Sequence, residues 1–110
     1  MEILESRVRG VLVVAPVDRL DAVGAPELSE RLLDRISAGE PRIVLDLSRL
    51  VYISSGGLRA LARAGRELRA ARGRLDLAGA AGAVKEVLEL SGFSGAFPMF
   101  ASAEDAVTGA

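Results

Sequence analysis

Two hydrophobic periods alternate along the chain, and this predicts strands that alternate with helices. A nearly continuous apolar run from Val11 to Val17 follows the tight turn Arg9–Gly10, which indicates a hairpin leading into a buried strand. Pro16 cannot donate to a ladder, so the strand is expected to end near it. Similar runs predict three more strands, at residues 42–47, 75–78 and, as an edge strand containing Pro98, 97–100.

Apolar residues spaced three to four apart predict four helices. The first begins near Ala25, with Pro26 suited to its first turn, and covers about fourteen residues before Gly39. The second begins around Gly56, after an exit loop at 48–53, and ends before Gly73. Its predicted buried stripe is Leu58, Leu61, Ala62, Gly65 and Leu68. Residues 81–90 and a short segment opened by the capping box 102–105 complete the set.

This order predicts an α/β fold in one domain, residues 1–110. Strands that alternate with helices form a largely parallel or mixed sheet with helices packed on it. We expect a mixed, mostly parallel sheet of about four to five strands with about four helices. A chain of 110 residues has room for one core.

Composition narrows the function. The net charge of -1 disfavours nucleic acid as a direct partner. The chain has no Cys and no His, which removes thiolate nucleophiles, the commonest neutral-pH base and the usual zinc ligands. The charged N-terminus and the short apolar runs predict a cytoplasmic protein without membrane insertion. No cofactor is expected.

The segment from Ser54 to Arg59 carries the most chemistry, because it joins a strand exit to a helix start. Helix N-termini present unpaired N–H groups, so an anion near Ser55 is favoured there. The structural alternative is that Ser55 is the N-cap. A Ser55 nucleophile would need Lys85 as its base, but Lys85 is expected on another helix as a solvated charge.

Two other clusters have both structural and functional interpretations. Asp18 and Asp21 follow the second strand and could bind a metal or a partner, although turn formation is the commoner role. Six arginines lie between Arg59 and Arg74. A solvated helix face is a better interpretation of these arginines than an RNA-binding surface, because no aromatic residue for base stacking lies among them. Docking to an acidic protein stays open as an alternative.

The string from Asp46 to Leu61 resembles the signature of STAS domains, the anti-sigma factor antagonists and their relatives. Residues 17–28 resemble the segment before the first helix of that family, and residues 88–93 with Phe97–Pro98 resemble its C-terminal third. The resemblance therefore extends over nearly the whole chain. Ser54 stands where the family usually has Asp, and Gly56 replaces a Ser or Ala.

The resemblance implies a non-enzymatic regulator that binds an anti-sigma factor with serine kinase activity. It places the phosphoacceptor at Ser55, with Ser54 as the alternative. The implied partner-binding residues are Asp21, Ser54, Ser55, Gly56, Gly57, Leu58 and Arg59. Other readings are a STAS scaffold without phosphorylation, such as a subunit of a lipid-transport ATP-binding-cassette system, and a small-ligand sensor. A weak homodimer also stays open.

Overall fold

A five-stranded sheet forms the centre of the molecule in the computed structural model, which describes residues 1–109. Its strands, in spatial order, are β1 (Ile3–Val8), β2 (Val11–Pro16), β4 (Arg42–Asp46), β6 (Arg74–Ala78) and β7 (Met99–Phe100). The β1–β2 hairpin is antiparallel and the other three pairings are parallel. The predicted hairpin, the end of β2 at Pro16 and the edge position of β7 are confirmed.

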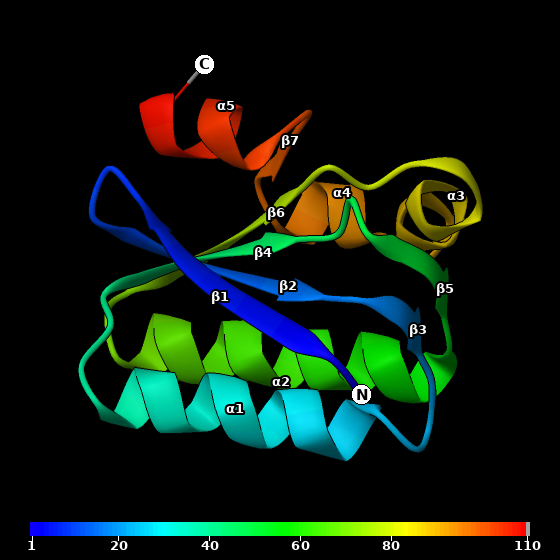
Figure 1. Ribbon diagram of the computed structural model, residues 1–110, viewed down its shortest axis with the longest axis horizontal. Coiled ribbons are helices and arrows are strands. Elements are labelled where there is room, and N and C mark those ends of the chain that lie inside the picture. Colours follow the sequence, from blue (N-terminus) through cyan, green and yellow to red (C-terminus); the bar gives the residue numbers. More distant parts are fainter. Residues whose placement is uncertain (110) are drawn as a thin grey trace.

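Helices cover both faces of this sheet, as Figure 1 shows. Helices α1 (Ala25–Ser37) and α2 (Ser55–Ala70) lie side by side on one face, and α5 (Ala103–Thr108) lies on the other. Leu12 and Val14 of β2 join the larger core under α1 and α2, whereas Val13 joins a smaller core with Ala106 of α5. Burial on both faces explains why β2 is apolar throughout.

Residues 1–109 contain five helices rather than about four. Helix α3 (Gly82–Leu90) agrees with the predicted segment, but α4 (Phe93–Ala96) was not predicted. This single turn follows Gly92, whose φ of 78° suits glycine, and it stacks Phe93 on Phe97 with ring centroids 5.4 Å apart. Four residues are too few to show a helical period, so only packing reveals the turn.

The exit loop predicted at 48–53 is wrong in part, because Leu50–Ile53 forms strand β5. It pairs in parallel with β3 (Asp18–Leu20), where turn residues were expected. Asp18 has a φ of 73°, and the register shifts between it and Arg19. These short strands carry no alternation that the sequence could reveal, and they form by pairing with each other across about thirty residues of chain.

The buried face of α2 also differs from the predicted stripe. Leu61, Gly65 and Leu68 are buried as expected, but Leu58 and Ala62 are only half-buried. The remaining buried positions are Gly57, Ala60 and Ala64. A Cβ added at Gly65 would overlap the Phe97 ring, so close approach to its neighbours, rather than side-chain size, determines which face α2 buries.

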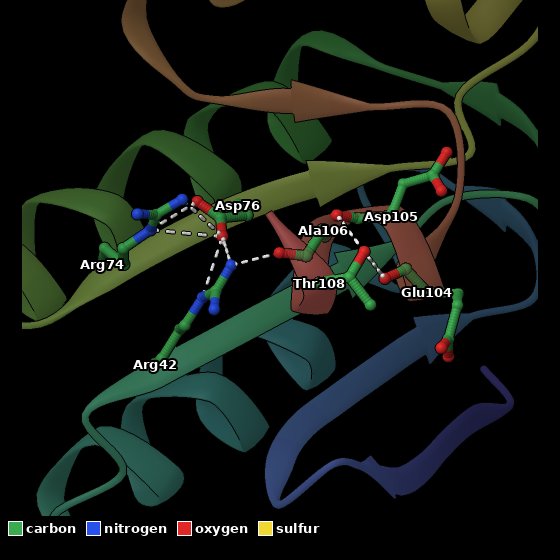
Figure 2. A network of polar contacts seen from close by, with 7 residues as sticks. All are labelled: Arg42, Arg74, Asp76, Glu104, Asp105, Ala106 and Thr108. Atoms are coloured by element: carbon green, nitrogen blue, oxygen red, sulfur yellow. Dashed lines mark hydrogen bonds and ion pairs between the residues drawn. The ribbon is translucent and has the colours of Figure 1, made fainter. Parts of the chain in front are cut away.

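A network of hydrogen bonds and ion pairs connects α5 to the sheet, as Figure 2 shows. Asp76 of β6 is fully buried and accepts hydrogen bonds from Arg42 at 2.8 and 3.1 Å and from Arg74 at 3.0 Å. Arg42 also donates to the Ala106 carbonyl. Ser102 caps α5 by accepting from the Asp105 amide at 3.1 Å, which confirms the predicted start of this helix.

Candidate functional site

The β3–β5 pair positions the start of α2. The Ser54 amide donates to the Leu20 carbonyl at 2.9 Å, so the end of β3 anchors the chain directly before the helix. The Ser54 hydroxyl accepts from the Gly57 amide at 3.2 Å, and the extended backbone of Ser54 is that of an N-cap. The N-cap is therefore Ser54, and the interpretation of Ser55 as the N-cap is wrong.

Ser55 is the first residue of α2 and is exposed. Ser54 provides the cap of the helix, so the Ser55 hydroxyl is not needed as a cap. Among residues 1–109 this hydroxyl has no hydrogen-bond partner. It lies at the positive end of the helix dipole. The junction thus contains one serine that holds the helix and one that faces solvent.

The two glycines after Ser55 differ in whether the structure requires a glycine at their position. A Cβ at Gly57 would lie 2.8 Å from the Leu20 carbonyl oxygen and 2.9 Å from the Ile53 side chain, so only glycine lets α2 start this close to β3. At Gly56, the nearest atom to such a Cβ would be the Ser54 hydroxyl oxygen at 3.6 Å, an ordinary contact. The space at Gly56 would therefore accept a larger residue.

Asp21 lies in the loop that follows β3 and organises the start of α1. Its carboxylate accepts from the Gly24 and Val23 amides, both at 3.1 Å. These hydrogen bonds, with the Gly24 amide as the larger contribution, lower the pKa of Asp21 below its ordinary value. The adjacent Ala22 lies against Gly56, which brings this loop beside the start of α2.

The predicted partner-binding residues thus divide by role. Ser55 and Arg59 project from the first turns of α2 and are exposed, and Gly56 lies between them. Ser54 and Gly57 hold the helix start, and Leu58 packs half-buried against the core. Beside Gly56 and Arg59, an open groove of about 380 Å³ separates the starts of α1 and α2. Its other lining residues are Ala22, Ala25, Pro26, Ser29, Ala60 and Arg63.

Sequence reasoning missed an exposed surface next to this helix start. On the β3–β5 pair, the Arg19 guanidinium lies 4.2 Å from the centre of the Tyr52 ring, and Val51 is 64% exposed. Val23, in the loop beyond β3, is 87% exposed. The sequence did contain a signal for this surface, because large apolar residues stand in a segment that was interpreted as a loop.

The remaining candidates are not brought together. Lys85 is exposed on α3, and within residues 1–109 no hydrogen bond or ion pair joins it to another residue. In the same range, no group of three or more His, Cys, Asp or Glu residues is placed to hold a metal ion. None of the helices in the described part of the chain has the length and apolar character needed to cross a bilayer.

Comparisons with known proteins agree with this architecture. A model of the STAS domain matches residues 4–106. A Bordetella bronchiseptica protein named "Putative anti-sigma factor antagonist BtrV" is 37% identical over 106 residues, which cover 96% of this chain and 91% of that protein. The crystal structure of an anti-sigma factor antagonist from Mycobacterium paratuberculosis superposes with a TM-score of 0.88 at 28% identity, covering 98% of this chain and 92% of the other.

The fold is also that of the Bacillus cell fate determinant SpoIIAA in its phosphorylated form. That structure gives a TM-score of 0.76 at 24% identity and covers 97% of each chain. The STAS domain model thus matches nearly the whole sequence. The chain belongs to the STAS domain family and, with the anti-sigma factor antagonists of that family, is a regulatory, non-enzymatic protein.

Proposed function

We propose that this protein antagonises an anti-sigma factor and is switched off when that partner, acting as a serine kinase, phosphorylates Ser55. The contact surface comprises the start of α2, Ser54–Arg59, with Asp21 in the neighbouring loop. The observation that carries the proposal is the exposed Ser55 hydroxyl on a helix start that Ser54 caps. Residues 1–110 act as one domain in the cytoplasm.

The helix start supports Ser55 over Ser54 as the acceptor. Phosphorylating Ser54 would turn the oxygen that accepts from the Gly57 amide into a more weakly accepting ester oxygen and would place a phosphoryl group on a half-buried capping side chain. Ser55 can be modified without breaking a hydrogen bond to any residue in the range 1–109. An exposed first-turn hydroxyl is also the one that a kinase could reach.

The same geometry explains how one phosphate could act as a switch. Phosphorylation adds roughly 1.5 to 2 negative charges at a position that the helix dipole favours, so the fold should survive. A partner covering Ser55 would have to desolvate this dianion, which is costly without a matching cation. A change of about 3 kcal/mol already weakens binding more than a hundredfold. SpoIIAA has this fold in its phosphorylated form, which is compatible with a fold that tolerates the modification.

The test measures binding of the purified cognate anti-sigma factor by isothermal titration calorimetry. We expect Ser55→Ala to bind like the unmodified wild type and Ser55→Asp to bind at least tenfold more weakly, because the added charge lies inside the contact. Ser94→Asp is the matched control, since Ser94 is an exposed serine on α4. Equal affinities for the two Ser55 variants would contradict the proposal.

A second measurement tests the modification itself. Protein purified from its native host should show an added mass of about 80 Da, corresponding to one phosphoryl group, and peptide mapping should place it on Ser55. Incubation with the anti-sigma factor and ATP should produce the same mass on wild type but not on Ser55→Ala. Labelling that persists in Ser55→Ala and disappears in Ser54→Ala would move the acceptor to Ser54.

A further inference from the structure

The arginines of this protein include two contrasting groups. Six of them form ion pairs with carboxylates: Arg7, Arg9, Arg31, Arg35, Arg42 and Arg74. The four on α2 are exposed, and none of them is within ion-pair distance of a carboxylate in the described part of the chain. These four, Arg59, Arg63, Arg66 and Arg69, are called the arginine face below.

The arginine face continues the surface that begins at Ser55. An α-helix turns by about 100° per residue, so Ser55, Arg59 and Arg66 lie within about 40° of one another around α2, opposite its buried side. They extend over about 16 Å along the axis. Arg63 leans toward the groove beside α1, and Arg69 lines a hollow on the other side of α2 with Phe97.

Nearby carboxylates do not neutralise this face. Glu67 is on α2 itself, and Glu30 and Asp34 of α1 line a shallow groove together with Arg63. Within residues 1–109 none of the three forms an ion pair, so the positive charge of α2 faces solvent. Arginines that are exposed and unpaired add little to the stability of a domain. Their presence in a row therefore needs another explanation.

We propose that the arginine face docks a carboxylate-rich surface of the protein partner, extending the contact at Ser55 by two further turns of α2. This inference rests on the proposed function, because it concerns the same partner. Planar guanidinium groups bind carboxylates in bidentate geometry, so a row of them fits an acidic surface. Nucleic acid is the poorer fit, since the chain has a net charge of -1 and α2 carries no aromatic residue for base stacking.

The test compares Arg66→Glu with Arg49→Glu in binding to the cognate anti-sigma factor. Arg66 is two turns beyond the predicted contact, whereas Arg49 is exposed and lies outside α2. We expect Arg66→Glu to weaken binding at least tenfold, mostly through slower association, and to reduce the salt dependence of the affinity. Arg49→Glu should change the affinity less than twofold, and Arg66→Lys, which keeps the charge but loses the bidentate geometry, should bind with an affinity between those of wild type and Arg66→Glu. Circular dichroism should show that each variant is folded.

The outcomes separate this inference from the proposed function. If Arg66→Glu binds like wild type while Ser55→Asp does not bind, the arginine face is not part of the contact, and the function proposed above stands. If the wild type itself fails to bind the anti-sigma factor, both proposals fall. If wild type binds a 20-base-pair DNA duplex more tightly than the anti-sigma factor, and Arg66→Glu abolishes this, the acidic protein surface is the wrong partner.

Discussion

Arginine serves two different purposes at two places in this molecule. Beneath α5, Arg42 and Arg74 surround a carboxylate that is fully buried, and Arg42 also bonds a helix carbonyl (Figure 2). Along α2, Arg59 and Arg66 face solvent without a carboxylate partner within residues 1–109. The first set connects the C-terminal helix to the sheet, whereas we expect the second to contribute little to the stability of the domain.

This contrast indicates where the protein can change without unfolding. A buried charge needs its partners, because an unpaired charge in the interior is costly. An exposed, unpaired charge has no such constraint and is available for binding. The two serines at the start of α2 show the same contrast between a bonded and an unbonded polar group. The Ser54 hydroxyl accepts a hydrogen bond from the Gly57 amide, whereas the Ser55 hydroxyl has no partner within residues 1–109.

Removing the buried charge should have the largest effect. Asp76→Asn leaves Arg42 and Arg74 with one amide oxygen in place of a carboxylate, and we expect a loss of about 2–3 kcal/mol in the free energy of unfolding. Urea unfolding followed by circular dichroism measures this loss. Asp34→Asn, at an exposed position of α1, is the control and should change stability by less than about 0.5 kcal/mol. Equal effects of the two substitutions would show that the network is not structural.

Adding one methyl group at the start of α2 should have the second-largest effect on stability. Gly57→Ala places a Cβ against the Leu20 carbonyl oxygen, and the required backbone shift should cost about 1–3 kcal/mol. Gly56→Ala has room and should leave stability unchanged or raise it by up to about 1 kcal/mol, since Ala favours helices over Gly. Thermal unfolding compares the two variants. If they behaved alike, close packing of α2 on β3 would not explain Gly57.

The two serines should differ by a smaller amount. Ser54→Ala removes the N-cap of α2 and should lower the free energy of unfolding by about 1 kcal/mol. Ser55→Ala should change it by less than about 0.5 kcal/mol. Chemical denaturation of both variants checks this order. A larger cost at Ser55 would contradict the assignment of Ser54 as the cap.

The smallest effect concerns the pH dependence of stability. Burial acts to raise the pKa of Glu5, but hydrogen bonds from Arg35 and Arg31 outweigh it and lower the pKa below the ordinary 4.5. A carboxyl with a lowered pKa in the folded state stabilises the protein above about pH 4.5, and this contribution is lost as the pH falls through the lowered pKa.

Comparing Glu5→Gln with wild type tests this contribution. The variant should be less stable at pH 7, by less than about 1 kcal/mol because the Arg31 and Arg35 side chains are 39% and 45% exposed, and the difference should shrink toward pH 3. Urea midpoints at pH 7, 5 and 3 provide the measurement. Glu30→Gln, at an exposed position without an ion pair in the described residues, should follow the wild-type curve. A gap that widens in acid would give the opposite sign for the Glu5 shift.

The sequence predicted most of the main sheet because its central strands β2, β4 and β6 are buried on both faces. The apolar run of β2 and its end at Pro16, and the start of α1 next to Pro26, are local signals that tertiary structure did not override. The β3–β5 pair was missed because each strand is short and half-exposed, and each exists only by pairing with the other.

The sequence alone determined that this chain folds as an α/β domain and that its chemistry concentrates between Ser54 and Arg59, because periodicity, glycines and residue types are local properties. Only the tertiary structure decided which serine caps α2 and which is free. That choice follows from the Leu20 carbonyl, which fixes Ser54 through a contact between residues far apart in the chain. It likewise decided which arginines are paired, since Asp76 meets Arg42 only when β4 lies beside β6.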